Sequence, residues 1–191
     1  MYSLKIISST VRPGRKGPII ANWIADLARR HGSFDVEVLD LGVINLPLMN
    51  EEHHPMLRKY QHEHTRKWSS AIDAADAFIF VTAEYDYNYP APLHNALEYL
   101  YHEWNYKAAS IVSYGGLSGG TRAWSKLKGD LSTFKIMAIP EAVNIPFYAQ
   151  YISDEEVFAA TESMQKSAAA MLNELLKWAK ALQPLRVKEP A

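Results

Sequence analysis

The stretch Ala77–Leu100, AFIFVTAEYDYNYPAPLHNALEYL, decides the fold of this chain. It begins with the apolar run Phe78–Val81, whose β-branched and aromatic residues are typical of a strand buried on both faces of a parallel sheet. The polar segment Thr82–Tyr89 follows directly. Beyond Pro92 the pattern becomes that of a helix, because apolar residues recur with helical spacing at Leu93, Ala96, Leu97 and Leu100. The stretch therefore predicts a strand, a polar aromatic loop and a helix.

The loop between this strand and this helix is a candidate binding site. It carries three tyrosines within eight residues, at Tyr85, Tyr87 and Tyr89. In an open α/β sheet, ligands bind at the carboxyl ends of the strands, and three aromatic rings suit a flat aromatic ligand. An alternative stays open, because aromatic residues are also enriched at protein interfaces, where they would cover a sheet end or a subunit contact.

Length, charge and cysteine content limit the class of protein. The chain has 191 residues, 48% of them apolar, and a net charge of −1. We expect one domain over residues 1–191, since single domains commonly reach ~200 residues. The near-neutral charge argues against nucleic acid and membrane as partners, and the lack of cysteine excludes disulfides and zinc–thiolate sites. Because MYSLKIISST is not a signal peptide and no apolar run approaches ~18 residues, we expect a cytoplasmic protein.

The beginning of the chain describes a site for an anion. A short apolar strand, Tyr2–Ser8, is followed by the basic loop Ser9–Gly17 and by an amphipathic helix, Pro18–Arg30. The first N–H groups of a helix and the helix dipole attract anions. Thr10 adds a hydroxyl, and Arg12, Arg15 and Lys16 add three positive charges. This arrangement predicts a phosphate site, although no dinucleotide or Walker A motif is present; the alternative is a solvated basic turn.

The next segment predicts a βαβ unit and a long connection. Phe34–Leu41 alternates apolar and polar residues and predicts the second strand, linked to the first in a right-handed unit. Gly42–Met56 is long for a connection, so we expect a lid or an oligomer arm there. A charged helix is predicted over Arg58–Ala75. Four histidines gather in this region without helical metal-ligand spacing, so no metal site is predicted at His53, His54, His62 and His64.

A second candidate loop follows the predicted fourth strand, Lys107–Ser113. In the loop Tyr114–Ala123, four glycines within six residues allow the backbone to approach a ligand closely; the alternative is a flexible turn before the helix Arg122–Leu131. The remaining predicted elements are a fifth strand region broken by Pro140, a long terminal helix ended by Pro184, and a loose tail, with the bounds Phe134–Ile139, Ala142–Ile145, Asp154–Leu182 and 185–191.

Three motifs at the loops after strands one, three and four carry a resemblance to a known family. Thr10–Arg15 resembles the phosphate loop G-S-x-R-x-G-R, Ala83–Ala96 resembles P-E-Y-N-x-S-x-P-G-x-L-K-N-A, and Ser113–Ala123 resembles S-x-G-x-x-G-G-x-R-A. The chain resembles the NAD(P)H-dependent FMN reductases, the flavodoxin-like group with quinone, azo-dye and chromate reductases, over Lys5–Leu182. The expected fold is accordingly α/β, a three-layer flavodoxin-like sandwich around a five-stranded parallel sheet of order 2-1-3-4-5.

The resemblance implies an FMN site built from all three loops. It implies that the phosphate lies at the first loop and the start of the first helix, with the residues Thr10, Arg12, Arg15, Lys16, Gly17 and Pro18. It implies that the flavin ring lies against the second loop and near the glycine loop, with the residues Ala83, Glu84, Tyr85, Asp86, Tyr87, Ser113, Gly115 and Gly116. Among the departures from the motifs, His94 replaces lysine and Asp86 replaces asparagine. A carboxylate only accepts hydrogen bonds, so Asp86 would not donate to a flavin carbonyl as an amide does.

The resemblance also implies an activity. FMN would take hydride from NADPH or NADH and pass it to a quinone, a free flavin or a similar acceptor by a ping-pong mechanism, and no residue is predicted to be catalytic because the cofactor does the chemistry. One alternative is a flavodoxin-type electron carrier, although such carriers are strongly acidic. Another is a serine hydrolase using Ser8 or Ser9, although neither of these serines lies in a G-x-S-x-G elbow.

The predicted helix Ala91–Glu103 suggests assembly into a homodimer or homotetramer, which the family resemblance also implies. Beside its apolar stripe, the region carries aromatic surface at Tyr99, Tyr101, His102 and Trp104, and Tyr and Trp are favoured at interfaces. We expect two copies to meet here across a two-fold axis, so that Leu97→Asp lowers both dimerisation and flavin affinity. The alternative is that Trp104 and Tyr106 pack beneath the fourth strand.

Overall fold

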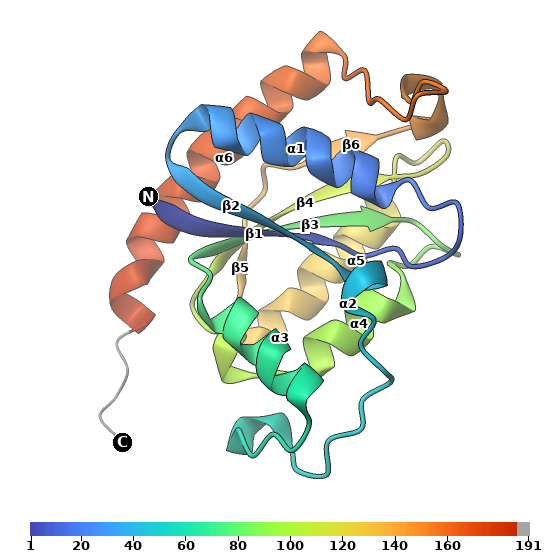
Figure 1. Ribbon diagram of the computed structural model, residues 1–191. Helices are drawn as coiled ribbons and strands as arrows, with labels where there is room; N and C mark the ends of the chain where they lie inside the picture. The colour runs from blue at the N-terminus through green and yellow to red at the C-terminus, as the bar shows by residue number, and fades with distance from the viewer. Residues whose placement is uncertain (187–191) are drawn as a thin grey trace.

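The computed structural model describes residues 1–186, so the predicted tail beyond Arg186 lies outside the described residues. Its centre is a parallel sheet of order β2-β1-β3-β4-β5, in which β6 also pairs with β4 (Figure 1). The strands are β1 Tyr2–Ser8, β2 Phe34–Asp40, β3 Ala77–Ala83, β4 Ala108–Tyr114, β5 Met137–Ala138 and β6 Val143–Ile145. The predicted flavodoxin-like α/β class and strand order 2-1-3-4-5 are confirmed.

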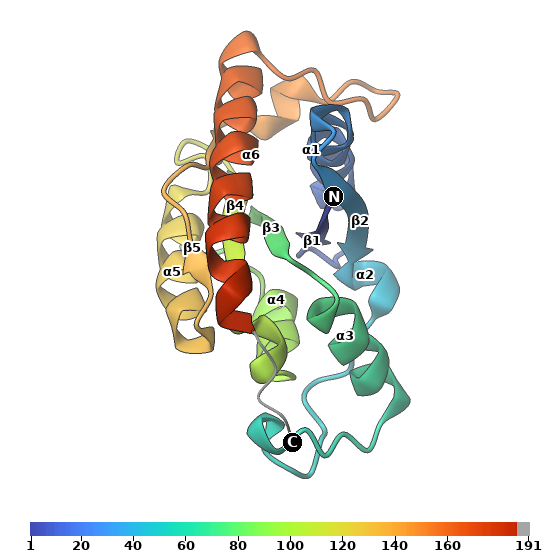
Figure 2. The same cartoon turned by 90° about the vertical axis from the view of Figure 1, so that its left-hand side faces the viewer.

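Helices cover both faces of the sheet (Figures 1 and 2). One face packs against α1 Gly17–His31 and α6 Glu162–Leu182, and the other packs against α2 Leu41–Ile44, α3 Glu63–Asp73, α4 Ala91–Glu98 and α5 Thr121–Leu131. Short 3-10 turns occur at Pro55–Leu57, His102–Trp104, Ser132–Phe134, Tyr148–Tyr151 and Gln183–Arg186.

The central strands β3 and β4 have every residue buried, as the apolar run in β3 predicted. Successive side chains of a strand point to opposite faces. Accordingly, Phe78 and Phe80 pack beneath α3, α4 and α5, whereas Ile79 and Val81 pack beneath α1 and α6. This single strand therefore joins the two hydrophobic cores that stabilise the sandwich.

The parallel register brings the three predicted loops to one edge of the sheet. Ser8, the last residue of β1, lies opposite Val81, and Ala83, the last residue of β3, lies opposite Tyr114 at the end of β4. The segments that follow these three strands therefore begin side by side, which positions the basic loop, the tyrosine loop and the glycine loop around one place.

Two predicted helices begin later in the chain than the sequence suggested. The helix predicted from Arg58 begins at Glu63, because the carboxylate of Glu51 accepts hydrogen bonds from the N–H groups of Gln61 and His62, 2.7 and 3.1 Å away, and so ends the connection there. The helix predicted from Asp154 begins at Glu162, where the Oγ1 atom of Thr161 accepts from the Met164 N–H group at 3.2 Å.

The predicted helix Ala91–Glu103 is wrong beyond Glu98, and so is the reason given for an exposed aromatic surface. Tyr99 and Trp104 are fully buried within the protomer, and the Trp104 ring lies 5.1 Å from that of Phe78. The alternative is therefore confirmed for Trp104, which packs beneath the sheet, but it is wrong for Tyr106, which is exposed. Because Leu97 is also buried, Leu97→Asp would disrupt the fold and does not test a dimer.

The long connection Gly42–Met56 lies against the chain's own helix α4. The side chain of Asn95 donates to the carbonyl of Pro47 at 2.7 Å and accepts from the N–H group of Met49 at 2.8 Å. These two bonds fix the middle of the connection. Four apolar side chains in this connection or directly after it are nevertheless exposed, at Val43, Leu48, Met56 and Leu57.

Candidate functional site

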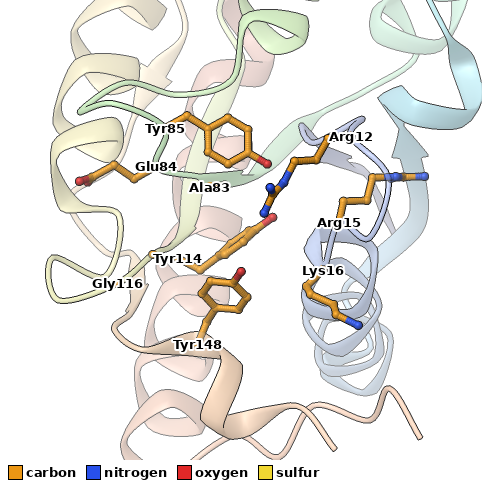
Figure 3. A pocket seen from close by; sticks show the side chains of 10 residues that line it. Arg12, Arg15, Lys16, Ala83, Glu84, Tyr85, Tyr114, Gly116 and Tyr148 are labelled. Carbon is orange, nitrogen blue, oxygen red and sulfur yellow. The ribbon is translucent and has the colours of Figure 1, made fainter. Parts of the chain in front are cut away.

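The three loops surround a cavity of about 260 Å³ at the carboxyl edge of the sheet (Figure 3). Of the residues predicted for the site, those that line this cavity are Arg12, Arg15, Lys16, Ala83, Glu84, Tyr85, Gly115 and Gly116. Asp86 and Tyr87 line an adjoining shallow hollow with Glu84. Pro18 lies in the first turn of α1 and faces a different hollow, on the side of α1.

The positive charges of the basic loop are not equivalent. The Nη1 atom of Arg15 contacts the Asp40 carboxylate at 2.5 Å and donates to the carbonyl of Thr10 at 3.1 Å. The Nζ atom of Lys16 donates to the Glu156 carboxylate at 2.8 Å. Figure 3 shows that Arg15 points away from the cavity centre, whereas Arg12 reaches into it.

Arg12 is the cation of this loop that forms no ion pair with any of residues 1–186. Its guanidinium carbon lies 5.6 Å from the centroid of the Tyr85 ring. An unpaired guanidinium in a concave site is available to bind an anionic group in fork geometry. Arg12 therefore makes this part of the cavity suited to a phosphate or a carboxylate.

A hydroxyl floor lies beneath the cavity: Tyr114 lines the cavity, and the buried residues Ser8, Ser9 and Thr10 lie behind the lining. The Oγ1 atom of Thr10 lies 3.4 Å from the hydroxyl of Tyr114, and both side chains are buried. The buried Oγ atoms of Ser8 and Ser9 have no hydrogen-bond partner within the described part of the chain. A buried hydroxyl without a partner is costly, but Ser8 and Ser9 do not line the cavity, so the group of this floor that faces a ligand is the Tyr114 hydroxyl.

The start of α1 comes within contact distance of this floor because residue 17 is glycine. A Cβ atom at Gly17 would lie 2.4 Å from Thr10 Oγ1 and 2.9 Å from the Tyr114 hydroxyl. In the region that the structure describes, no side chain caps the first turn of this helix. Pro18 has no N–H, and Ile19 and Ile20 donate to the Lys16 carbonyl. The Gly17 N–H and the helix dipole therefore remain available for an anion beside Arg12.

Glu84 lines the cavity with its backbone end, but its carboxylate points away (Figure 3). The carboxylate accepts from the main-chain N–H of Arg122 at 3.1 Å and from Arg122 Nη1 at 2.9 Å. Burial acts to raise the pKa of Glu84, but hydrogen bonds from Arg122 and Ser118 outweigh burial, and the pKa lies below its usual value. Glu84 thus joins the tyrosine loop to the start of α5.

The tyrosine loop closes as a tight turn between Tyr85 and Asn88. Their backbones exchange two hydrogen bonds of 2.8 and 2.9 Å, and the two residues between them, Asp86 and Tyr87, have φ values of 49° and 66°. Positive φ at both central residues is typical of a type I′ turn, in which large side chains are strained. Tyr87 is 67% exposed, and the guanidinium of Arg122 lies 4.2 Å from its ring centroid.

Two aromatic residues of the cavity were not predicted. Tyr114 and Tyr148 line it, with ring centroids 4.9 Å apart. The sequence motif predicts Ser113 for the site and not Tyr114. Adjacent strand residues face opposite sides, and the Ser113 hydroxyl donates to the carbonyl of Gly119, away from the cavity. Strand alternation beside a known cavity residue would have identified Tyr114, whereas no sequence pattern marks Tyr148.

The predicted histidine cluster lies away from the cavity. The rings of His62 and His64 stack 5.1 Å apart beside the Gly42–Met56 connection, and neither lines the cavity. Within residues 1–186, no group of three or more His, Cys, Asp or Glu residues is arranged to hold a metal ion. Over the same residues, every helix is too short or too polar to cross a membrane.

Comparisons with known proteins agree with this geometry. Residues 3–150 match the family model described as NADPH-dependent FMN reductase. The chain is 43% identical over 137 residues to an NAD(P)H-dependent FMN reductase of Schizosaccharomyces pombe, covering 71% of this chain and 68% of that one. It is 35% identical over 153 residues to an NAD(P)H-dependent FMN reductase of Saccharomyces cerevisiae, covering 74% and 80%.

A solved structure has the same fold. A flavoenzyme NAD(P)H:acceptor oxidoreductase from Paracoccus denitrificans superposes with a TM-score of 0.77, at 21% identity, over 95% of this chain and 98% of that one. At this level of identity the likeness concerns the fold alone.

Proposed function

Because the chain belongs to the NADPH-dependent FMN reductase family, we propose that the cavity at the carboxyl edge of its sheet binds FMN and that the protein moves hydride from NAD(P)H to an oxidised acceptor there. The family assignment confirms the resemblance found in the sequence, the prediction of an oxidoreductase, and FMN with NAD(P)H as the cofactors of that family. The location of FMN, the acceptor and the kinetic order belong to the proposal.

The observation that carries the proposal is the pairing of Arg12 with the hydroxyl floor. Arg12 brings positive charge without an ion-pair partner among residues 1–186, and Thr10 brings a hydroxyl beside the uncapped start of α1. Together these groups match the oxygens and charge of one phosphate monoester. Arg15 and Lys16 line the cavity, but their charges already pair with Asp40 and Glu156.

The size of the cavity favours a flavin ring that lies at the cavity mouth and not inside. About 260 Å³ is slightly less than the roughly 300 Å³ at which ligand cavities usually begin. The phosphate and the sugar chain would occupy this space, and the flavin ring would lie against the backbone of Ala83–Tyr87 and near Gly115 and Gly116. Tyr85 and Tyr87, both exposed, border that position.

In the bound state, FMN supplies the hydride chemistry, and this chain supplies position and electrostatics. Arg12 and the floor hold the phosphate, the tyrosine turn and the glycine loop orient the ring, and Tyr114 and Tyr148 exclude water from the inner side. A ring at the mouth presents one open face, which NAD(P)H and then a flat acceptor such as a quinone would use in turn. One shared face predicts ping-pong kinetics.

The proposal is tested by the absorption spectrum of the purified protein and by identification of the cofactor released on heating. We expect bound FMN, either as isolated or after reconstitution, and parallel double-reciprocal plots with NADPH and a quinone. Released FAD, or a protein that takes up no flavin, would contradict the FMN site. Intersecting plots would contradict the ping-pong order but not the site.

The two rival functions are distinguished by observations on the same protein. A flavodoxin-type carrier would bind FMN but would not oxidise NAD(P)H in a steady-state assay. For the serine hydrolase, the hydroxyls of Ser8 and Ser9 are buried and neither contacts a base within the described residues. A serine-directed probe that labels the folded protein would be needed to support that function.

Three further expectations remain proposals. Residues 1–191 form one FMN-binding domain, the protein works in the cytoplasm where NAD(P)H is available, and the chain assembles as a homodimer or homotetramer. Support for assembly now comes from the exposed apolar side chains at Val43, Leu48, Met56 and Leu57. Light scattering of the parent and of Leu48→Asp tests this: the parent should be an oligomer that Leu48→Asp weakens, and a monomeric parent at micromolar concentration would contradict it.

A further inference from the structure

A hydrogen-bonded chain holds the end of the tyrosine loop against two helices. Tyr89, the last tyrosine of that loop, has a buried ring. Its hydroxyl lies 2.7 Å from the Asp130 carboxylate on α5 and 2.8 Å from Nδ1 of His94 on α4. The other ring nitrogen of His94, Nε2, lies 3.1 Å from the carboxylate of Glu98. Four side chains from a loop and two helices are thus joined in series.

The number of hydrogens available in this hydrogen-bonded series restricts which group donates and which accepts. A tyrosine hydroxyl has one hydrogen, and an ionised carboxylate only accepts. If Tyr89 donates to Asp130, its oxygen must accept from His94, so Nδ1 carries a hydrogen. Nε2 then faces a carboxylate, which requires a hydrogen there as well. The complete chain therefore needs a doubly protonated, positively charged His94.

A neutral His94 allows a different arrangement. With its one hydrogen on Nε2, the ring still donates to Glu98, but Nδ1 becomes an acceptor. The Tyr89 hydroxyl then turns to donate to His94, and the Asp130 carboxylate loses its donor. The hydrogen bond between Tyr89 and α5 is lost in this state, while the hydrogen bond between Tyr89 and α4 remains.

We propose that His94 is a positioning residue whose charge determines whether Tyr89 bonds to Asp130, and that this sets how firmly the tyrosine loop is held. The groups that face this network among the described residues are Tyr89 from the loop, Glu98 from α4 and Asp130 from α5. His94 and Glu98 are each about half exposed, at 55% and 51%. Such an exposed pair contributes little stability by itself, so the effect comes from the direction of the Tyr89 hydrogen.

The consequence for the site follows from the position of Tyr89. It comes directly after the strained turn Tyr85–Asn88, which has positive φ at its two central residues. A strained turn persists only when its surroundings hold it. Loss of the bond to Asp130 should therefore loosen the turn. That this weakens flavin binding rests on the proposed function; the loosening itself does not.

The first experiment uses the flavin-free protein. Nitrogen-15 NMR of the His94 ring is followed from pH 5 to 8, the range in which histidines titrate. We expect the neutral ring to carry its hydrogen on Nε2. A neutral ring with its hydrogen on Nδ1 would overturn the proposal, because Tyr89 would then keep donating to Asp130.

The second experiment measures hydrogen exchange of the Tyr85 and Asn88 amides, corrected for the intrinsic effect of pH. Protection should fall about three- to tenfold between pH 5.5 and 8 in the parent, the range for loss of one hydrogen bond. It should be high and independent of pH in His94→Gln, whose amide can donate to the Tyr89 oxygen at every pH, and equally in His94→Lys, which keeps a positive charge. The control is His31→Gln. His31 is the last residue of α1, at the end away from the cavity, so this variant should behave as the parent. The same pH dependence in His94→Gln as in the parent would overturn the proposal.

The third experiment measures flavin affinity at pH 6 and pH 8. Riboflavin is used beside FMN because a phosphate monoester titrates near pH 6 by itself. Riboflavin affinity should fall about three- to tenfold in the parent and should not change in His94→Gln. An equal fall in both proteins would overturn the link to the site. A protein that binds neither flavin would contradict the proposed function, while the NMR and exchange results would still decide the role of His94.

Discussion

The carboxylate of Glu84 binds both the main-chain N–H and the guanidinium of Arg122, at 3.1 and 2.9 Å. These residues are 38 positions apart, at the end of β3 and in the first turn of α5. The N-cap residue of α5 is Gly120, which has no side chain to accept from the first N–H groups. Glu84 performs that task from another segment, and in doing so it fixes the tyrosine loop relative to the glycine loop.

Glu84→Gln should lower the free energy of unfolding by about 1–2 kcal/mol at pH 7, the range for a helix cap or a charge-assisted hydrogen bond. The pKa of Glu84 is lowered in the folded protein from 4.5, so in acid the unfolded chain takes up this proton first. The advantage over Glu84→Gln is therefore complete above about pH 4.5 and is lost as the pH falls through the folded-state pKa. Urea unfolding at several pH values measures this.

The matched control for Glu84→Gln is Glu162→Gln, on an exposed side chain that pairs with Lys166 one helical turn away. Exposed pairs of this kind contribute little, so the control should unfold almost as the parent does. A Glu84→Gln protein with parental stability at pH 7 would show that the bond to Arg122 does not stabilise the fold.

Lys107 should make the protein more stable as the solution becomes moderately alkaline. Its side chain is 4% exposed and donates to the carbonyls of Ile72 and Asp73 at the end of α3, at 2.6 and 2.9 Å. Burial lowers the pKa of Lys107 to about 8, although Asp73 acts in the opposite direction. Above that value the folded protein loses this proton while the unfolded chain still carries it, so the free energy of unfolding should rise with pH.

The expected rise is on the order of 1 kcal/mol between about pH 8 and 9.5. Lys107→Met should be less stable at every pH and should lack the rise, whereas Lys180→Met, at an exposed position of α6, should retain it. Urea unfolding at half-unit steps of pH measures the slope. An unchanged slope in Lys107→Met would assign the rise to another group.

The sheet could be predicted from the sequence because its signals are local. Residues Phe78–Val81 are apolar without interruption since both faces of β3 are buried, and the parallel order brings the loops after β1, β3 and β4 to one edge. The starts of the helices depend on contacts between distant segments. Asp154 and Thr161 are both good N-cap residues, and the choice of Thr161 depends on a backbone bridge between Ile152 and Phe158 that no local pattern reveals.

The sequence predicts which loops form the site but not which of their charged side chains is free to bind a ligand. Sequence places Arg12, Arg15 and Lys16 in one loop with equal claims on a phosphate. Which of them is available depends on Asp40 and Glu156, which are distant in the chain and become neighbours only in the fold. Tyr148 enters the cavity for the same reason, from a turn after β6.

Arg12→Ala should weaken FMN binding by roughly 1.5–3 kcal/mol, the range for a hydrogen bond to a charged group. The loss should be smaller for riboflavin, which has no phosphate. Calorimetric titration with both flavins measures the difference. Equal losses for the two flavins would show that Arg12 does not contact the phosphate.

A comparison with Arg15→Ala makes this result specific. Arg15 is bonded to Asp40 and to the Thr10 carbonyl, so its removal should lower the stability of the loop and reduce the binding of both flavins to a similar degree. If Arg15→Ala instead discriminates between FMN and riboflavin as strongly as Arg12→Ala does, the phosphate lies closer to Arg15 than we propose.

Gly116→Val should block flavin binding without disturbing the fold. A Cβ atom at Gly116 would meet no other atom of the described chain within 4 Å, yet the residue lines the cavity. The added side chain would therefore fill space that we assign to the flavin ring. We expect at least about fivefold weaker FMN binding, since an added side chain in occupied space costs about 1–3 kcal/mol, with an unchanged Tm of the flavin-free protein. Gly17→Val is the contrast: its Cβ atom would lie 2.4 Å from Thr10 Oγ1, so it should lower the flavin-free Tm as well. Full FMN affinity in Gly116→Val would mean that the ring lies elsewhere.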